Sequence, residues 1–552
     1  MCDYINQKQK RLFLKNAVII DGTGAERRQA DILLENGKIS RISTAGTSAA
    51  FTVGEGDQII NCNPDWIVSP GFIDVHSHGD FALFFDPAQK IKLFQGVTTE
   101  IEGNCGISAA PVNAGYLNEL MIYASFLGSD KSITRAELEG FESFSSYLKA
   151  VSSLNLGINP GFLIGHGTLR MSVMGMEKRR PDREELAKMK TLLAEGMANG
   201  ALGLSSGLIY PPGVFADCDE LAELCKVVAE YDGVYSTHMR NESFRMPASV
   251  QETLDIGRRT KCRVHISHHK VTAKQRWGDT EVSLKMIEDA NAQGLFVRAD
   301  VYPYTASCTT LTCMIPPEFL EGGIADLLAR LKNTGDRKRI EDRIFSDDQD
   351  WENPYRESGF EYILIIDGQK TPDAIGRTLA EYANLKGISG MDALFEILIE
   401  NNCGVTCVEF CMDEKEVENV LSHSMTMIGS DSGVDCPGMK FHPRTSGTFP
   451  RVLGHYARER GIFTLEQAVR KISGMPAETF RLKEKGFIKE GYDADLVIFN
   501  HKTIIDKSDY YNAARPPEGI EYVILGGSIA VHANRHTGNT MGRVVGIKPL
   551  RA

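Results

Sequence analysis

The sequence has no long apolar run. No stretch approaches the ~18 consecutive apolar residues of a transmembrane helix, so no such helix is expected. Charged residues interrupt the N-terminal stretch MCDYINQKQKRLFLKNAVII, which therefore lacks the apolar core of a signal peptide. There is also no convincing short repeat and no low-complexity tract. We therefore expect neither a transmembrane helix nor a secretory signal peptide.

Cysteine and basic charge are also in short supply. Twelve cysteines among 552 residues are too few for a disulfide framework, so we expect reduced thiols and a cytoplasmic location. Lysine and arginine total 61 against 73 acidic residues, and the net charge of −12 argues against a nucleic-acid or membrane partner. A small anionic substrate is still compatible, because one or two local cations suffice to bind it. The sequence leaves open whether the chain forms a homo-oligomer.

The hydrophobic content of 42% and charged content of 24% are ordinary for a globular protein. Short apolar runs with period-two alternation and turn residues make the first segment, 1–68, β-rich, and the last segment, 481–552, has the same texture. We expect these two ends to pair into one small β domain around a catalytic domain at 69–480.

The middle of the chain alternates short β-like runs with helical patterns such as REELAKMKTLLAEGMANG. About eight such repeats predict an α/β fold, a (β/α)8 or TIM barrel of parallel strands. The runs lie near 66–76, 97–102, 160–165, 201–206, 233–238, 263–268, 294–301 and 425–430. The gap between the last two is too long for one crossover, so 305–390 is expected to be an insertion that covers the active site.

The first of these runs ends in GFIDVHSHGD. Because residues two apart on a strand point to the same face, Asp74, His76 and His78 share one face. Both imidazoles could then reach one metal ion at the mouth of a barrel. The alternative is that they are ordinary polar residues where a strand meets solvent.

Three other runs end in possible metal ligands. Cys105 lies in GNCGIS, where the flanking glycines permit a tight turn, although a buried free thiol would also fit. His238 ends the fifth run. In RVHISHHK, His268 shares the apolar face of the sixth run, whereas His265 and His269 would point to the helical layer and are interpreted as structural residues or as residues that support the ligands from behind.

The eighth run ends at Asp431 in IGSDSG. Strand ends of one barrel converge in space, so these separate residues together predict a single site. Thiolate and imidazole suit Zn²⁺, and three protein ligands with an open position are typical of catalytic zinc. A competing cysteine cluster, CGVTCVEFC, lacks a CxxC pair, and we interpret it as core thiols: Cys403, Cys407 and Cys411.

The chain resembles the amidohydrolase superfamily, and within it the D-aminoacylase (N-acyl-D-amino-acid deacylase) family. The motifs run in order over nearly the whole chain: GFIDVHSHGD, GNCGIS, GHGTLR, SSGLIYPPG, THMRNES, ISHHK, YPYTAS, IGSDSG, HPRTSGTFPRVLG, EGYDADLVIFN and ARPPEGIEYVIL. The resemblance implies a tightly held zinc bound by Cys105, His238 and His268. It further implies that His76 and His78 can hold a second, weaker metal that shares the cysteine.

The resemblance also implies roles in catalysis. Asp431 would be the catalytic acid and base, and Arg444 of HPR would bind the substrate α-carboxylate. Lys270, Tyr302 of YPY and Tyr210 are further expected substrate-binding residues. The implied reaction is zinc-dependent hydrolysis of N-acyl-D-amino acids. Because the loop from Thr305 to Ala329 contains no lysine or arginine, we expect neutral or hydrophobic side chains to be favoured.

Two alternatives remain at this point. A hydrolase of cyclic amides, such as a hydantoinase or dihydroorotase, relies on a carboxylated lysine, and GALGLSSGLIYPPG at the fourth run contains none. A non-catalytic amidohydrolase-like scaffold would be expected to lack metal ligands, whereas here all five ligands and Asp431 are present.

Overall fold

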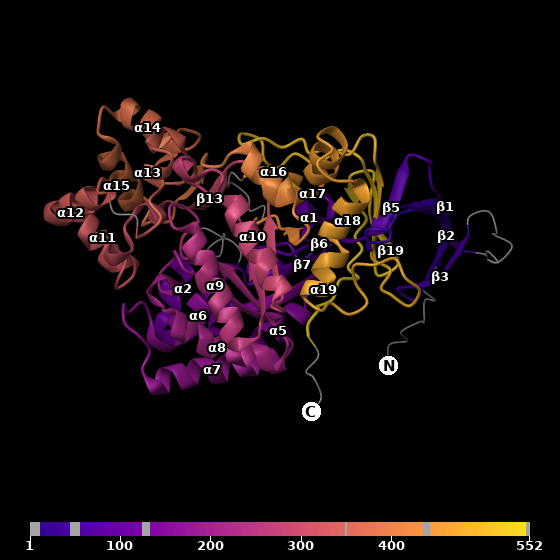
Figure 1. Ribbon diagram of the computed structural model, residues 1–552, viewed down its shortest axis with the longest axis horizontal. Helices are drawn as coiled ribbons and strands as arrows, with labels where there is room; N and C mark the ends of the chain where they lie inside the picture. The colour runs from indigo at the N-terminus through magenta and orange to yellow at the C-terminus, as the bar shows by residue number, and fades with distance from the viewer. Residues whose placement is uncertain are drawn as a thin grey trace.

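The computed structural model describes residues 11–44, 54, 56–123, 133–347, 350–433 and 442–547. The outermost parts of the two expected terminal segments, 1–10 and 548–552, lie outside the described residues. Figure 1 shows a central barrel with its helices, a group of helices (α11 to α15) at the upper left, and a sheet at the right. Within the described residues, no helix has both the length and the hydropathy needed to cross a bilayer.

Eight parallel strands form the barrel, as predicted. Their order in the sheet is β16-β12-β11-β10-β9-β8-β7-β6, and a parallel bridge between Ser77 and Ser432 brings the two end strands together. Every strand is almost wholly buried, as expected where helices cover the outer face. The strands are β6 (Phe72–Asp74), β7 (Val97–Glu102), β8 (Asn159–Gly165), β9 (Gly203–Gly207), β10 (Val234–His238), β11 (Arg263–Ile266), β12 (Val297–Val301) and β16 (Thr426–Ile428).

Helices alternate with these strands and cover the barrel (Figure 1). A typical start is that of α8, where the Asp217 side chain accepts hydrogen bonds from the backbone N–H groups of Asp219 and Glu220. The covering helices are α1 (Lys90–Leu93), α5 (Phe144–Ser152), α6 (His166–Met174), α7 (Arg183–Ala198), α8 (Cys218–Glu230), α9 (Met246–Thr260), α10 (Asp279–Ala292), α16 (Glu414–Ser422), α17 (Arg444–Arg451), α18 (Leu465–Ile472) and α19 (Gly474–Thr479). Two short helices, α2 (Leu117–Tyr123) and α4 (Arg135–Glu139), lie between β7 and β8.

Strands from both ends of the chain form one mixed sheet, again as predicted. β17 pairs antiparallel with β5, which joins the C-terminal strands to the N-terminal ones, and Figure 1 shows them side by side. Only Gly71 separates β5 from the barrel strand β6, and a Cβ there would lie 2.1 Å from Thr98 Oγ1. The strands are β1 (Leu12–Ile19), β2 (Arg28–Glu35), β3 (Lys38–Thr44), β4 (Gln58–Asn61), β5 (Trp66–Pro70), β17 (Leu496–Asn500), β18 (Ile520–Leu525), β19 (Ser528–His532) and β20 (Arg535–His536).

The segment between β12 and β16 has its own small sheet, in the order β13-β15-β14, and its own hydrophobic cluster. The buried Cys403 and Cys407 belong to that cluster, which fits their interpretation as core thiols. The elements are β13 (Ser307–Thr310), β14 (Ile363–Asp367), β15 (Thr406–Glu409), α11 (Ile324–Lys332), α12 (Thr334–Ile344), α13 (Pro354–Glu357), α14 (Leu379–Lys386) and α15 (Gly390–Glu400). We call this segment the insertion.

Candidate active site and metal centre

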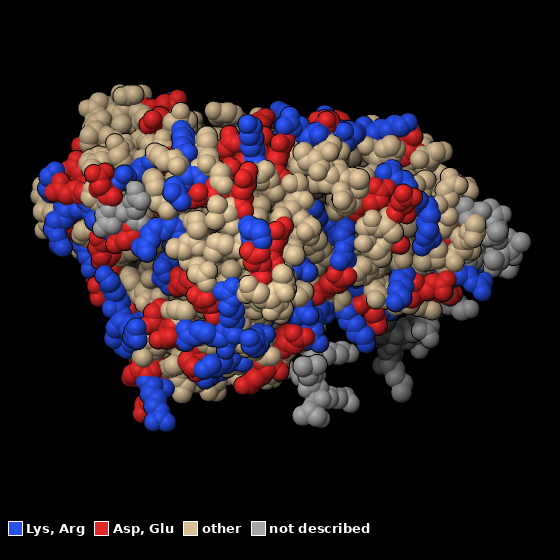
Figure 2. All heavy atoms as spheres, in the orientation of Figure 1, with Lys and Arg blue, Asp and Glu red and all other residues tan. Residues whose placement is uncertain are grey.

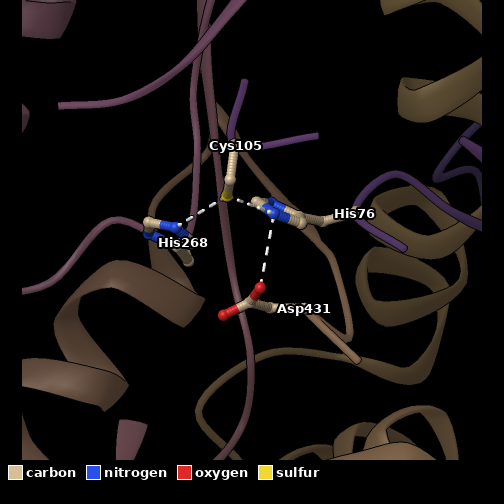
Figure 3. Close-up of side chains that lie close together, drawn as sticks. All are labelled: His76, Cys105, His268 and Asp431. Carbon is tan, nitrogen blue, oxygen red and sulfur yellow. Dashed lines mark hydrogen bonds and ion pairs between the residues drawn. The ribbon is translucent and has the colours of Figure 1, made fainter. Parts of the chain in front are cut away.

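The two histidines after β6 face the centre of the barrel mouth. His76 Nε2 lies 3.2 Å from Cys105 Sγ, and His78 Nε2 lies 3.2 Å from Asp431 Oδ1. Both histidines are buried. Figure 3 shows His76 between Cys105 and Asp431. The structure therefore brings these two histidines to the same site as Cys105 and Asp431, rather than placing them at a solvent boundary.

Cys105 sits in a tight turn that follows β7. Its φ is +52°, and the flanking Gly103 and Gly106 have φ values of +74° and +77°. A Cβ on Gly103 would lie 2.1 Å from the carbonyl oxygen of Leu163, so only glycine fits there. Burial alone would raise the pKa of the Cys105 thiol, but the charges of His76 and His268 bring it well below its ordinary value. The turn therefore presents a thiolate, the form that binds metal ions.

His268 and His238 lie on the other side of the thiolate. His268 Nε2 is 3.4 Å from Cys105 Sγ, and the rings of His238 and His268 are 4.4 Å apart, centre to centre. β11 ends at Ile266, and His268 has a φ of +34°, so strand alternation does not extend to His268. The residue reaches the site through a strained turn instead.

Asp431 and Arg444 form an ion pair next to these ligands. Arg444 Nη1 lies 2.9 Å from Asp431 Oδ2, and Arg444 Nη2 also donates to the backbone carbonyl of Cys308. Burial would raise the pKa of the Asp431 carboxyl, but the charge of Arg444, followed by those of His268 and His76, lowers it well below its usual range. The group is therefore ionised at neutral pH and able to accept a proton.

The remaining three expected residues surround the same site. Lys270 Nζ lies 5.7 Å and Arg444 Cζ 4.6 Å from the centre of the Tyr302 ring. The Tyr302 hydroxyl has no hydrogen-bond partner within the described residues. Tyr210 packs its ring 5.1 Å from that of His238, while its hydroxyl lies 2.9 Å from Thr309 Oγ1. Each of the three thus lies next to a ligand candidate or the arginine.

Sequence reasoning missed two buried carboxylates that hold the ligands in place. Asp300 Oδ2 lies 3.1 Å from His76 Nδ1, and Asp300 Oδ1 accepts a hydrogen bond from the backbone N–H of His268. Glu242 Oε1 lies 2.9 Å from His268 Nδ1, and its Oε2 lies 2.5 Å from Lys270 Nζ. Carboxylates in this position orient imidazoles toward a metal. The only signal in the sequence was position, since Asp300 lies near the end of the seventh run and Glu242 closely follows His238.

The charges of these supporting residues stabilise one another. Burial would raise the pKa of Glu242, but the charges of His268 and Lys270 lower it to about 2. Burial would conversely lower the pKa of His268, but Glu242 chiefly raises it to about 9. His265 Nδ1 lies 3.0 Å from Ser236 Oγ, and His265 Nε2 lies 2.8 Å from Asp300 Oδ2. His265 therefore contacts a carboxylate that orients a ligand and does not itself reach the group of ligands.

The donor set fits a transition-metal ion. Ligand atoms of His76, Cys105, His268 and Asp431 all lie within 4.8 Å of one another, and so do those of His238, Glu242 and His268. His238 is 5% exposed, and neither of its ring nitrogens has a hydrogen-bond partner within the described residues. Such buried, unpartnered nitrogens are costly unless something binds them. One thiolate with several imidazoles is the donor chemistry that zinc prefers.

A cavity of about 570 Å³ opens over these residues. Its walls come from the strand ends of the barrel and from the insertion, including Ser307, Thr312 and Leu320. The space-filling view in Figure 2 shows Lys and Arg interspersed with Asp and Glu on the face drawn, with no separate basic stripe on that face. A cavity of this volume, with apolar walls and a few charged and polar groups, is suited to a small molecule.

Comparisons with known proteins agree with this site. Residues 65–531 match the amidohydrolase family. The chain belongs to the amidohydrolase family. It is 34% identical to a D-aminoacylase of Alcaligenes xylosoxydans xylosoxydans over 534 residues, which cover 97% of both chains.

Two solved structures extend the likeness to the fold. One is the D-aminoacylase studied for the functional role of its binuclear metal centre, with one-metal activation and second-metal attenuation (33% identity, TM-score 0.80, 97% and 99% coverage). The other is N-acyl-D-glutamate deacylase of Bordetella bronchiseptica with zinc and a phosphonate inhibitor (31% identity, TM-score 0.81, 97% and 100% coverage). This chain is accordingly a metal-dependent amidohydrolase similar to the D-aminoacylases.

Proposed function

We propose that this amidohydrolase is a zinc-dependent N-acyl-D-amino-acid deacylase that releases a carboxylic acid and a free D-amino acid. The proposal rests mainly on one observation: the Cys105 thiolate, the ligand histidines and Asp431 lie close together beside Arg444. A metal-ligand set, a proton acceptor and a carboxylate-binding cation within one cavity are what hydrolysis of an N-acyl amino acid requires. The proposal is also supported by the 34% identity to D-aminoacylase over nearly the full length.

In this proposal, Cys105, His238 and His268 would hold the tight zinc. His76 and His78, together with Cys105, would hold a second, weaker metal. Zinc bound there would polarise the amide carbonyl and lower the pKa of a water molecule toward ~7. Asp300 and Glu242 keep the ring nitrogens of His76 and His268 directed at the site through the contacts at 3.1 and 2.9 Å.

Asp431 moves the protons of the reaction. Its carboxylate, ionised at neutral pH, accepts a proton from the attacking water and delivers it to the nitrogen of the leaving amine. Without that proton the amine would be a poor leaving group. Arg444 binds the substrate α-carboxylate, because a planar guanidinium can form two parallel hydrogen bonds with it. Lys270 and the Tyr302 hydroxyl assist at the same end, and Tyr210 lies near the scissile amide.

This arrangement gives a physical reason for handedness. The α-carboxylate is fixed at Arg444 and the amide at the metal ligands, so two of the four directions around the substrate α-carbon are fixed. The cavity wall then accepts the side chain in only one of the two remaining directions. We propose that this direction corresponds to the D-enantiomer.

We propose that neutral or hydrophobic substrate side chains are favoured. The loop without lysine or arginine, 305–329, contributes several lining residues of the cavity. Glu352, Glu357 and Glu409 line the same cavity, and so do Lys178, Arg179, Arg180, Arg240 and Arg343. The proposed preference therefore rests on the loop 305–329 and not on the net charge of the cavity wall.

The cytoplasmic location expected from the sequence is part of this proposal. All ten cysteines that the structure describes are free thiols. A reducing compartment keeps such thiols reduced. It would also keep Cys105 available for zinc.

The experiment is a substrate panel with zinc-loaded protein. N-acetyl-D-methionine and N-acetyl-D-leucine should be hydrolysed with a higher kcat/KM than N-acetyl-D-glutamate and N-acetyl-D-lysine. A 5-substituted hydantoin tests the cyclic-amide alternative and should not be opened. Faster turnover of N-acetyl-D-glutamate would overturn the side-chain preference alone, whereas turnover of the hydantoin without any N-acetyl-D-amino acid would overturn the proposed reaction.

A further inference from the structure

A second cavity of about 570 Å³ adjoins the active-site cavity. Four residues line both cavities: Tyr210, Pro211, Thr312 and Leu320. The partition between the two spaces is therefore built from the side chains that they share. The mechanism proposed above uses only Tyr210 of these four, and it gives the second cavity no role.

The interior of the second cavity is apolar. Its described lining includes residues of α2 and α11, and its larger apolar side chains are Met121, Met176, Leu320, Ile324 and Leu327. The charged lining residues among those described are Glu119 and Arg135. Arg135 is exposed and donates hydrogen bonds to Asn118 and Glu139. A space of this composition favours methylene groups over water.

The position of the second cavity in the barrel indicates which part of a substrate would reach it. Tyr210 follows β9, whereas Asp431 and its partner Arg444 follow β16, four strands away in the eight-strand barrel. The two strands thus lie on opposite sides of the barrel, and at its mouth Tyr210 packs against His238 while Arg444 pairs with Asp431. When the α-carboxylate of an N-acyl amino acid binds Arg444 and its amide carbonyl lies at the ligands, the acyl chain continues toward Tyr210. The second cavity begins directly behind that residue.

We propose that the second cavity binds the acyl chain of the substrate, so that this protein favours medium-length linear acyl groups such as octanoyl over acetyl. This inference rests on the proposed function and names the acyl class that it leaves open. Each methylene removed from water contributes a favourable free energy of transfer. That contribution corresponds to about a fourfold gain in binding for each methylene that enters the cavity. We call this space the acyl cavity.

The first test is a chain-length series on the zinc-loaded protein: N-acetyl-, N-butanoyl-, N-hexanoyl- and N-octanoyl-D-methionine. We expect kcat/KM to rise with length, by about fourfold per methylene once the chain passes the partition. A flat or falling series, with N-acetyl-D-methionine still hydrolysed, would overturn the acyl cavity and leave the proposed function intact.

A matched pair of variants locates the effect. Ala325 and Ala329 are both exposed residues of α11, one turn apart, and only Ala325 lines the acyl cavity. Ala325→Trp should fill the cavity and lower the octanoyl-to-acetyl ratio of kcat/KM at least tenfold, while Ala329→Trp should keep the parent ratio. An unchanged ratio in Ala325→Trp, or an equal loss in both variants, would contradict the proposal.

Binding of the product acid gives a readout that needs no turnover. Isothermal titration of the protein with decanoate and with acetate should show tighter binding of decanoate, and Ala325→Trp should remove most of that difference. Equal affinity for the two acids in the parent protein would overturn the acyl cavity. If no N-acyl-D-amino acid of any length were hydrolysed but decanoate still bound selectively, the proposed function would fail and the cavity assignment would stand.

Discussion

Arg444 Nη1 lies 2.9 Å from Oδ2 of Asp431, and both side chains are buried. The residue expected to bind the substrate carboxylate therefore already pairs with the residue expected to move the proton. A substrate carboxylate that reaches Arg444 shares this guanidinium with Asp431. Binding of the substrate α-carboxylate at Arg444 is thereby linked to the charge around the Asp431 carboxylate.

The first prediction concerns this arginine. Arg444→Met should lower kcat/KM for N-acetyl-D-methionine by about 10- to 150-fold, because a hydrogen-bonded pair with a charged group contributes ~1.5–3 kcal/mol. The control substrate is N-acetyl-D-methioninamide, which lacks the carboxylate and should lose far less. The kcat/KM of Arg444→Lys should lie between those of the parent and of Arg444→Met, since lysine keeps the charge but not the planar fork. Equal losses for acid and amide would remove Arg444 as the carboxylate anchor.

The second prediction concerns Asp431. Asp431→Asn keeps the size of the side chain but cannot accept a proton, so kcat should fall by about 100- to 10,000-fold. Zinc content measured by mass spectrometry should stay near that of the parent, because the tight zinc rests on other residues. Full activity in this variant would show that the proton moves by another route.

The third prediction separates the two groups of metal ligands. His268→Ala should abolish zinc binding and activity, because it removes a ligand of the tight zinc and the imidazole that Glu242 holds at 2.9 Å. His76→Ala should leave much of the zinc in place, because it affects the weaker site. Zinc per chain in the two purified variants, compared with the parent, is the measurement. Complete zinc loss in His76→Ala with retention in His268→Ala would reverse the assignment of the two sites.

The fourth prediction concerns stability and lies away from the metal ligands. Burial lowers the pKa of Lys471 from 10.5 to about 7, and its Nζ donates to the backbone carbonyl of Thr426. Between these two pH values the unfolded state binds more protons than the folded state, so this lysine makes stability rise with pH. Below about pH 7 the cost of burying the charge is present in full.

Lys471→Met removes that titration. The free energy of unfolding of the variant minus that of the parent should therefore fall as pH rises from 7 to 10, by at most ~1.4 kcal/mol per pH unit. The difference, rather than either value alone, is diagnostic because it cancels the other groups that titrate in this range. Urea unfolding at several pH values measures it. A difference that does not change with pH would show that Lys471 stays protonated in the folded protein.

Much of the barrel could be predicted because its strands are short, buried and separated by helices with clear periodicity. Each of the eight predicted runs overlaps a barrel strand, such as β7 at Val97–Glu102. The pairing of the two chain ends was also foreseeable from their shared β-rich texture. Its register was not, because the pairing of β17 with β5 depends on residues more than 400 positions apart.

The site could be predicted only in part. His76 and Cys105 stood out because such residues rarely follow apolar runs so regularly. Glu242 and Asp300 did not stand out, since a carboxylate near a strand end is common and its role depends on the imidazole that it contacts. The strained backbone of His268, with φ of +34°, also lies beyond what strand alternation describes. The second cavity brings together α2, Tyr210 and α11, which no local pattern connects.

The central claim is that this metal-dependent amidohydrolase cleaves N-acyl-D-amino acids. The most direct measurement compares kcat/KM for N-acetyl-D-methionine and N-acetyl-L-methionine with zinc-loaded protein, following acetate and methionine release separately. We predict equimolar release of the two products from the D-enantiomer, with little or no release from the L-enantiomer. Equal turnover of both enantiomers, or none of either, would contradict this account.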